Sequence, residues 1–175
     1  VDNNFYFNVF EKYSEAELSE ITEYAKSIHF QFASYMSASK FYKDYALKTN
    51  DKTKFLEDYN QHVAIVALYL ANGNVKQAKQ FISAMVEQRY QPATPTFLNA
   101  GRARRGELVS CFLLEVDDSL NSINFIDSTA KQLSKIGGGV AINLSKLRAR
   151  GEAIKGIKGV AKGVLPIAKS LEGGF

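Results

Sequence analysis

Apolar residues recur at helical spacing through the first part of the chain, and this pattern stops at Pro92. Proline lacks the N–H that a helix needs and its ring clashes with the preceding turn, so Pro92 and Pro95 indicate a loop after a helical region. Further on, apolar runs of strand length alternate with helical periodicity, which is typical of a parallel α/β layer. The sequence therefore predicts a helical domain over residues 1–92 and an α/β domain over residues 93–175.

Four amphipathic helices are predicted in the first domain. The earliest begins at a capping box formed by Ser14 and Glu17, in which each side chain satisfies a free backbone donor. The other three are expected over residues 34–47, 54–71 and 75–89, where apolar side chains repeat every three or four positions. The short connections between these helices indicate a bundle.

The second domain is predicted to contain two strands, each followed by a helix. The strands are apolar runs at residues 108–116 and 140–144, and the helices span residues 120–135 and 160–172. Because the first run is almost continuously apolar, we expect its strand to be covered on both faces. Two parallel strands form an incomplete sheet, so this pattern also predicts that further strands are needed.

Composition limits the class of protein. No apolar run approaches the roughly 20 residues that cross a bilayer, and a single cysteine cannot form an internal disulfide. We therefore expect a cytoplasmic protein without membrane contact. Residues 100–175 carry 12 Lys and Arg against 7 Asp and Glu, whereas residues 1–99 carry 10 against 11. This excess favours an anionic ligand near the second domain but is too small to indicate nucleic acid.

Two glycine- or hydroxyl-containing segments are candidates for phosphate binding. Thr94 and Thr96, in the loop 93–97, offer hydroxyls beside free backbone donors. The alternative is a connector stiffened by proline, in which these hydroxyls bond to nearby groups of the loop itself. Gly137, Gly138 and Gly139 allow the backbone to approach a ligand closely, although a tight turn explains them equally well.

The remaining candidates are Cys111 with its neighbour Ser110, and the charged residues Asp118 and Arg148. A lone cysteine in an apolar strand is usually a small buried hydrophobe, whereas a redox role requires solvent access and a second thiol. Arginine offers a planar fork to phosphate, so Asp118 and Arg148 suit an anion site, but a helix cap and a solvated charge would also account for them.

The two histidines, His29 and His62, lie on or near predicted helices without a cysteine or glutamate at ligand spacing. We interpret both as ordinary helix residues and predict no metal site.

Several segments resemble one known family in their residues and in their order along the chain. These segments are residues 40–47, 89–101, 107–114, 118–123 and 137–141. They closely resemble the large, catalytic subunit of class I ribonucleotide reductases, and the bacterial class Ib type fits best. The resemblance implies that the second domain begins a ten-stranded α/β barrel. It also implies that the chain is an N-terminal fragment, inactive by itself, of an enzyme that reduces ribonucleoside diphosphates to deoxyribonucleoside diphosphates for DNA synthesis.

The same resemblance implies roles for individual residues. Cys111 matches the redox thiol that gives electrons to the substrate ribose and ends in a disulfide. Ser110, Gly139 and Cys111 itself match substrate-binding positions, as does either Thr94 or Thr96.

Asp118 and Arg148 match the allosteric specificity site, which binds a deoxynucleotide or ATP at a subunit interface, so a homodimer is implied. Further implied partners are a small subunit, whose metal–tyrosyl centre supplies the radical, and a glutaredoxin- or thioredoxin-like reductant. No cofactor is expected in this chain itself. An alternative hypothesis is a non-catalytic helical interaction module with a small α/β nucleotide-binding appendage and a structural Cys111.

Overall fold

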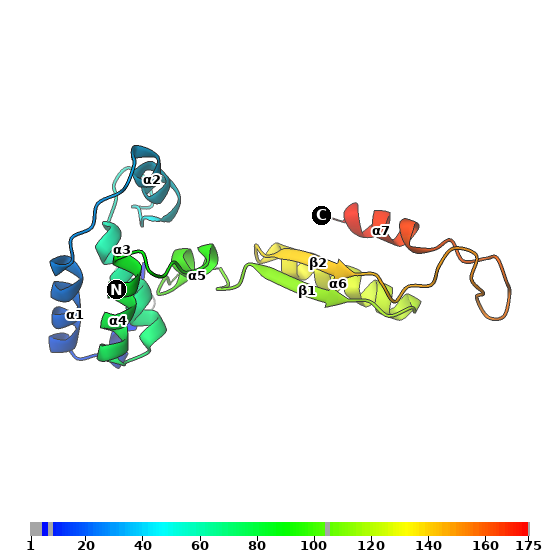
Figure 1. Cartoon of the computed structure of the whole chain (residues 1–175), viewed down its shortest axis with the longest axis horizontal. Coiled ribbons are helices and arrows are strands. Elements are labelled where there is room, and N and C mark those ends of the chain that lie inside the picture. Colours follow the sequence, from blue (N-terminus) through cyan, green and yellow to red (C-terminus); the bar gives the residue numbers. More distant parts are fainter. Residues whose placement is uncertain (1–4, 7–8, 104–105, 175) are drawn as a thin grey trace. The chain divides into compact units, whose positions relative to one another are not determined.

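The chain folds as a helical unit, Val1–Leu108, followed by an α/β unit, Val109–Phe175 (Figure 1). The structure is a computed structural model that describes residues 5–6, 9–103 and 106–174. The predicted order of a helical part and an α/β part is confirmed. The division lies after Leu108 rather than after Pro92, because the segment beyond Pro92 packs into the helical unit, where Phe97 and Ala100 are buried.

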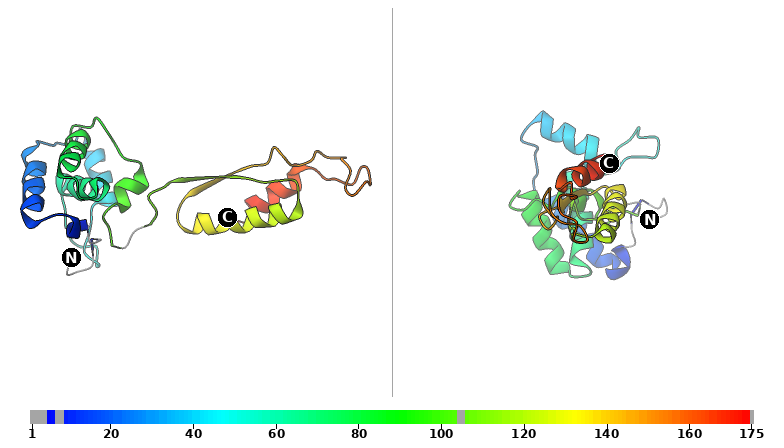
Figure 2. Two further views of the ribbon diagram at one scale, coloured as in Figure 1. Left: turned by 90° about the horizontal axis from the view of Figure 1, so that it is seen from below. Right: turned by 90° about the vertical axis from the view of Figure 1, so that its right-hand side faces the viewer.

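The core of the helical unit is built around one central helix. In chain order its elements are η1 (Val9–Lys12), α1 (Glu15–Ser27), α2 (Tyr35–Lys40), η2 (Phe41–Tyr45), α3 (Tyr59–Ala71), α4 (Val75–Val86) and α5 (Thr94–Asn99). Val63 and Ala67 of α3 are fully buried, and Ile21 of α1 and Ile82 of α4 are buried with them. The views of Figure 2 agree that α1, α3 and α4 lie side by side.

Capping residues set where two of these helices begin. The predicted box of Ser14 and Glu17 is present at α1, with the Ser14 N–H donating to the Glu17 carboxylate over 2.8 Å. The helix expected from residue 54 begins at Tyr59 instead, because Asp58, directly before it, and Gln61, in its first turn, form a second capping box.

Three further predictions about this unit require correction. The helix expected over residues 34–47 divides into α2 and the π-helix η2. The helix expected to reach residue 89 ends at Val86, since Gln88 adopts a left-handed conformation with φ 59°. The stretch after Pro92 is not wholly irregular, because Thr94–Asn99 forms α5, and Pro95 lies in its first turn, where a missing N–H costs nothing.

The α/β unit consists of β1 (Cys111–Glu115), α6 (Leu120–Lys135), β2 (Gly139–Asn143) and α7 (Val164–Glu172). β1 and β2 pair in parallel, as predicted. α6 runs along one face of the pair (Figure 2), and Ile126 of α6 is buried with Val116 and Leu147 in a small second core. The last helix begins at Val164 rather than at residue 160, after Gly163 with φ 76°.

The expectation that β1 is covered on both faces is wrong for the described residues. Exposure alternates along both strands, and on the more buried face Leu114 and Ile142 pack against the small core that contains Ile126 of α6. On the other face Leu113 is 83% exposed. Both helices lie on a single side of the pair, so within the described α/β unit one face of the sheet is uncovered.

Candidate functional site

Cys111 and Gly139 occupy the first positions of β1 and β2 and are register partners. Because the strands are parallel, their starting ends lie at the same edge of the sheet. The Gly139 N–H donates to the Ser110 carbonyl oxygen over 2.8 Å, and this hydrogen bond closes the edge. The structure therefore brings together three candidates that are up to 29 residues apart in the sequence, Ser110, Cys111 and Gly139.

The thiol of Cys111 is accessible. Cys111 is a free cysteine on the uncovered face, and its Sγ lies 3.5 Å from the Ser110 Oγ. Leu113 projects from the same face two residues further along β1. The usual alternative, a buried structural cysteine, does not describe Cys111 within this chain.

Different structural requirements explain the three glycines between the end of α6 and the first position of β2. Gly137 ends α6 with φ 90°, a left-handed conformation that glycine adopts without strain. A Cβ on Gly138 would lie 2.1 Å from the Phe112 ring, so only glycine fits there. A Cβ on Gly139 would meet nothing closer than the Ser110 carbonyl oxygen at 3.5 Å. Packing within the chain explains Gly137 and Gly138 but leaves room at Gly139.

Thr94 and Thr96 belong to the helical unit, at the start of α5. Thr94 is exposed, and its hydroxyl lies 3.3 Å from the Tyr45 hydroxyl. The half-buried Thr96 donates its hydroxyl proton to the Leu108 carbonyl oxygen over 3.0 Å. Thr94 is therefore the more accessible of the two, and the contact of either with a ligand stays a prediction.

Asp118 and Arg148 form an ion pair within the α/β unit. The Arg148 Nε–H donates to Asp118 Oδ2 over 2.7 Å, and Nη1 donates to the Ala153 carbonyl oxygen over 2.9 Å. Both side chains are about two-thirds buried, at 35% and 33% exposed. Asp118 does not cap α6, because Ser119 accepts the hydrogen bond from the Ser122 N–H instead. Arg148 is not simply a solvated charge.

The ion pair lines a pocket of about 450 Å³ between the start of α6 and the start of α7. Lys162 adds a second cation to the lining, and the free N–H groups at the start of α6 add a partial positive charge. Ile123 and Ile167 provide an apolar wall. This combination suits a ligand with an anionic group and an apolar ring. Lys162 was not predicted as a site residue, because no motif or spacing in the sequence connects it to Asp118 or Arg148.

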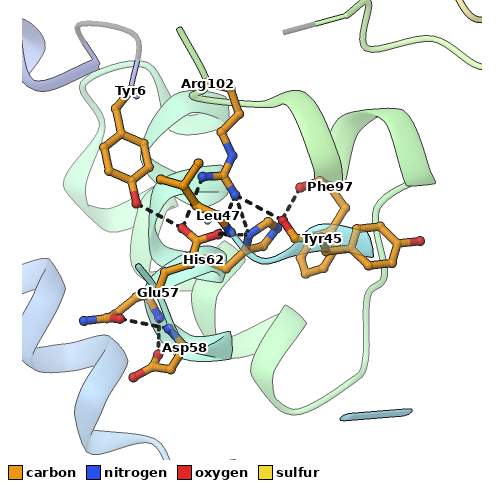
Figure 3. A network of polar contacts seen from close by, with 9 residues as sticks. Tyr6, Tyr45, Leu47, Glu57, Asp58, His62, Phe97 and Arg102 are labelled. Atoms are coloured by element: carbon orange, nitrogen blue, oxygen red, sulfur yellow. Dashed lines mark hydrogen bonds and ion pairs between the residues drawn. The ribbon is translucent and has the colours of Figure 1, made fainter. Parts of the chain in front are cut away.

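A buried polar cluster in the helical unit was not predicted. It consists of Glu57, His62 and Arg102, with the Tyr6 hydroxyl at its margin (Figure 3). The side chains of Glu57 and His62 are each 1% exposed. The prediction that His62 is an ordinary helix residue is therefore incomplete. Glu57 lies five positions before His62, which is not the spacing of neighbours on a helix face, and Arg102 lies 40 positions after it. No pattern in the sequence connects these residues.

Charge and burial act in opposite directions on Glu57. Burial alone would raise its pKa, but hydrogen bonds and positive charge from His62 and Arg102 outweigh it and lower the pKa to about 2. The pKa of Tyr6 is raised, first by burial and then by the adjacent Glu57 carboxylate. The carboxylate is therefore held ionised as the centre of the cluster.

Within the described segments no helix has the length and apolar character that crossing a bilayer requires. In the same residues no group of three or more His, Cys, Asp or Glu side chains is arranged to hold a metal ion.

Comparison with known proteins gives the family. Residues 31–105 match the family pattern described as "Ribonucleotide reductase, all-alpha domain", and residues 109–175 match "Ribonucleotide reductase, barrel domain". Over its whole length the chain is 55% identical to the ribonucleoside-diphosphate reductase subunit alpha of Bacillus subtilis (strain 168) and 46% identical to that of Mycoplasma pneumoniae. A ribonucleoside-diphosphate reductase large subunit of vaccinia virus is 27% identical over 93% of the chain.

The chain spans 25%, 24% and 20% of the length of these three relatives, respectively. It belongs to the family of class I ribonucleotide reductase large subunits. The helical unit contains the all-alpha domain of that family, and β1 to α7 lie in its barrel domain.

Proposed function

We propose that this chain forms one wall of the active site of a ribonucleoside-diphosphate reductase. The whole enzyme would reduce ribonucleoside diphosphates to deoxyribonucleoside diphosphates for DNA synthesis. The observation that carries the proposal is the accessible Cys111 thiol at the start of β1, paired in register with Gly139 and 3.5 Å from the Ser110 hydroxyl.

The electron balance defines what Cys111 does. Replacing the 2′-hydroxyl of ribose by hydrogen consumes two electrons and two protons and releases water. Two thiols supply both when they join in a disulfide. Cys111 contributes one thiol, and the second comes from outside these 175 residues, because the chain has no other cysteine. A glutaredoxin- or thioredoxin-like protein would then reduce the disulfide for the next cycle.

Position on a strand suits this role. Backbone hydrogen bonds of β1 and β2 fix the Cα of Cys111, so the thiol is held more precisely than it would be on a loop. The Ser110 hydroxyl and the backbone at Gly139 lie at the same sheet edge, where they would contact the ribonucleoside diphosphate. Thr94, or Thr96, is proposed to contribute a hydroxyl to the diphosphate from α5.

The pocket that contains Asp118 and Arg148 is proposed as the allosteric specificity site. Arg148 and Lys162 would bind the phosphates of a deoxynucleotide or ATP, and the apolar wall would contact the base. Leu120 and Phe125 on α6 are 72% and 68% exposed, which suits packing against a second copy of the chain. We propose a homodimer on this basis, together with a separate small subunit that supplies the radical. A cytoplasmic location stays a prediction.

A chimera tests the proposal. The chain would replace the matching quarter of the B. subtilis alpha subunit, and turnover would be measured with the small subunit and a thioredoxin-type reductant. The chimera should be active, and Cys111→Ser should lose turnover while nucleotide binding persists, because serine cannot donate electrons. Ser170→Ala, an exposed substitution on α7, is the control and should remain active.

Two results would count against the proposal. Normal turnover of Cys111→Ser would exclude the redox role. A chimera that folds and binds nucleotide but does not turn over would favour the non-catalytic alternative.

A further inference from the structure

Four segments that are distant in the sequence meet at the Glu57 carboxylate (Figure 3). The Tyr6 hydroxyl donates to Oε2 over 3.0 Å, and the Leu47 N–H donates to Oε1 over 2.8 Å. Arg102, directly beyond α5, donates to both carboxylate oxygens, and His62 Nδ1 lies 2.7 Å from Oε1. Glu57 is therefore bonded to the N-terminal segment, the turn after η2, α3 and the segment that follows α5.

His62 connects this carboxylate to α5. Its Nε2 lies 2.7 Å from the Phe97 carbonyl oxygen, and because a carbonyl oxygen only accepts, Nε2 donates. The last carbonyls of any helix lack partners within that helix, and α5 ends at Asn99. His62 therefore supplies a donor to a carbonyl in the last turn of α5 while its other nitrogen faces Glu57.

The other end of α5 is also tied to the cluster, through Tyr45. The Tyr45 carbonyl oxygen accepts from Arg102 Nη2 over 3.3 Å, and the Tyr45 hydroxyl lies 3.3 Å from Thr94 Oγ1. Its ring also contacts the Phe97 ring, with centroids 5.5 Å apart. The last turn of α5 is thus bonded to His62, which contacts Glu57 directly, and its first turn is connected to Glu57 through Tyr45 and Arg102.

A cluster of this kind is a poor source of stability. Burying charged groups is costly, and apolar side chains of similar volume often stabilise a core equally well or better. Directional hydrogen bonds, in contrast, define one orientation for the groups that they join. We propose that Glu57 and His62 are positioning residues that fix the orientation of α5, and with it the Thr94 and Thr96 hydroxyls, from the side buried in the core. The consequence for substrate rests on the proposed function of these threonines.

Two substitutions at His62 separate positioning from general stability. The side-chain amide of His62→Asn takes the place of Nδ1 and keeps the polar contact with Glu57 but cannot reach Phe97. The amide nitrogen of His62→Gln takes the place of Nε2 and keeps the donor to Phe97. Each variant loses one hydrogen bond of the same residue, so a merely structural role predicts similar behaviour in both.

Amide hydrogen exchange in the 175-residue chain is the primary measurement. In His62→Asn the amides of Phe97 and Ala100 should exchange roughly tenfold faster, which is the change that one lost hydrogen bond produces. In His62→Gln they should stay close to the original rate. Tyr45→Phe removes only the hydroxyl near Thr94, leaves the cluster intact, and should accelerate exchange at Phe97, whose N–H bonds to the Ala93 carbonyl oxygen. His29→Gln, at the exposed histidine, is the control.

The outcomes distinguish this inference from the proposed function. Equal exchange rates in His62→Asn and His62→Gln, or unchanged exchange in Tyr45→Phe, would overturn the positioning role. Faster exchange in His62→Asn supports it. In the chimera the same variant should then raise the KM for the nucleoside diphosphate more than it lowers kcat. An unchanged KM with faster exchange would leave the positioning of α5 supported and remove the threonines from the substrate site.

Discussion

The Phe112 ring occupies the space where Gly138 would carry a side chain, with a Cβ position only 2.1 Å from the ring. Gly139, the next residue, has no such neighbour, although it is the register partner of Cys111. The two adjacent glycines are therefore needed for different reasons. Gly138 is explained by packing inside the α/β unit, whereas the open space at Gly139 is available to a ligand.

Alanine should affect stability at Gly138 and substrate binding at Gly139. Gly138→Ala should lower the free energy of unfolding by about 1–3 kcal/mol, because it overpacks the Phe112 contact. Gly139→Ala should change it by less than about 0.5 kcal/mol, as substitutions without a steric conflict do. In the chimera, Gly139→Ala should raise the KM for substrate by blocking close approach to the backbone. Urea unfolding and steady-state kinetics measure the two effects, and an unchanged KM would remove Gly139 from the substrate site.

Gly101 should be far less tolerant of alanine than Gly156, although both have positive φ, at 76° and 82°. A Cβ on Gly101 would lie 2.6 Å from the Ile65 Cγ2 on α3, whereas a Cβ on Gly156 would meet nothing within 4 Å. Gly156→Ala should lower the free energy of unfolding by about 1–2 kcal/mol, from backbone strain alone. Gly101→Ala should cost more, because it also separates the end of α5 from α3. Equal losses in urea unfolding would show that packing at Gly101 contributes nothing.

Local patterns predicted much of this fold. The box at Ser14, the helix Leu120–Lys135 and the parallel pair β1–β2 depend on interactions between neighbours in the sequence or on side-chain periodicity, so they could be recognised. Pro95 indicates a loop by itself, but proline is also compatible with a first helical turn, and in the structure Thr94–Asn99 is helical with Phe97 buried in the core.

Contacts between distant residues account for what the sequence did not predict. Candidate residues such as Cys111 were found through family resemblance, since a lone cysteine carries little information by itself. The cluster around Glu57 joins residues up to 51 positions apart, and its charges have no common spacing. Lys162 lines the pocket together with Arg148 because of the path of the loop before α7, which no local sequence pattern predicts.

Glu57 should contribute to acid unfolding. Its pKa is lowered from 4.5 to about 2 in the folded chain, so the ionised form is favoured by folding. That contribution is fully present above pH 4.5 and is lost as the pH falls from 4.5 towards 2. A pKa change of this size corresponds to roughly 3 kcal/mol. Urea unfolding at a series of pH values should show a shallower acid loss for Glu57→Gln than for the original chain.

The same variant should be less stable at neutral pH, because it leaves the charge of Arg102 without its buried partner. Glu152→Gln, at an exposed carboxylate, is the matched control and should keep the original pH dependence. An identical acid loss in both variants would exclude Glu57 as a source of pH-dependent stability.

Arg148 should carry much of the affinity of the proposed effector site. Removing a charged hydrogen-bond donor typically costs about 1.5–3 kcal/mol, so Arg148→Ala in the chimera should weaken dTTP binding by roughly 10- to 150-fold. Lys158→Ala removes the same charge from the exposed loop without touching the pocket lining, and should have little effect. Calorimetry measures both affinities.

Asp118→Asn gives the more discriminating result at this site. Asparagine can still accept the hydrogen bond from Arg148 Nε, which spans 2.7 Å to Asp118 Oδ2 in the structure, but it carries no charge. If Asp118 acts by orienting Arg148, this variant should keep most of the dTTP affinity, whereas Asp118→Ala should lose it. If instead both variants bind dTTP as tightly as the unmodified chimera, the ion pair serves the fold of the α/β unit and the effector site lies elsewhere.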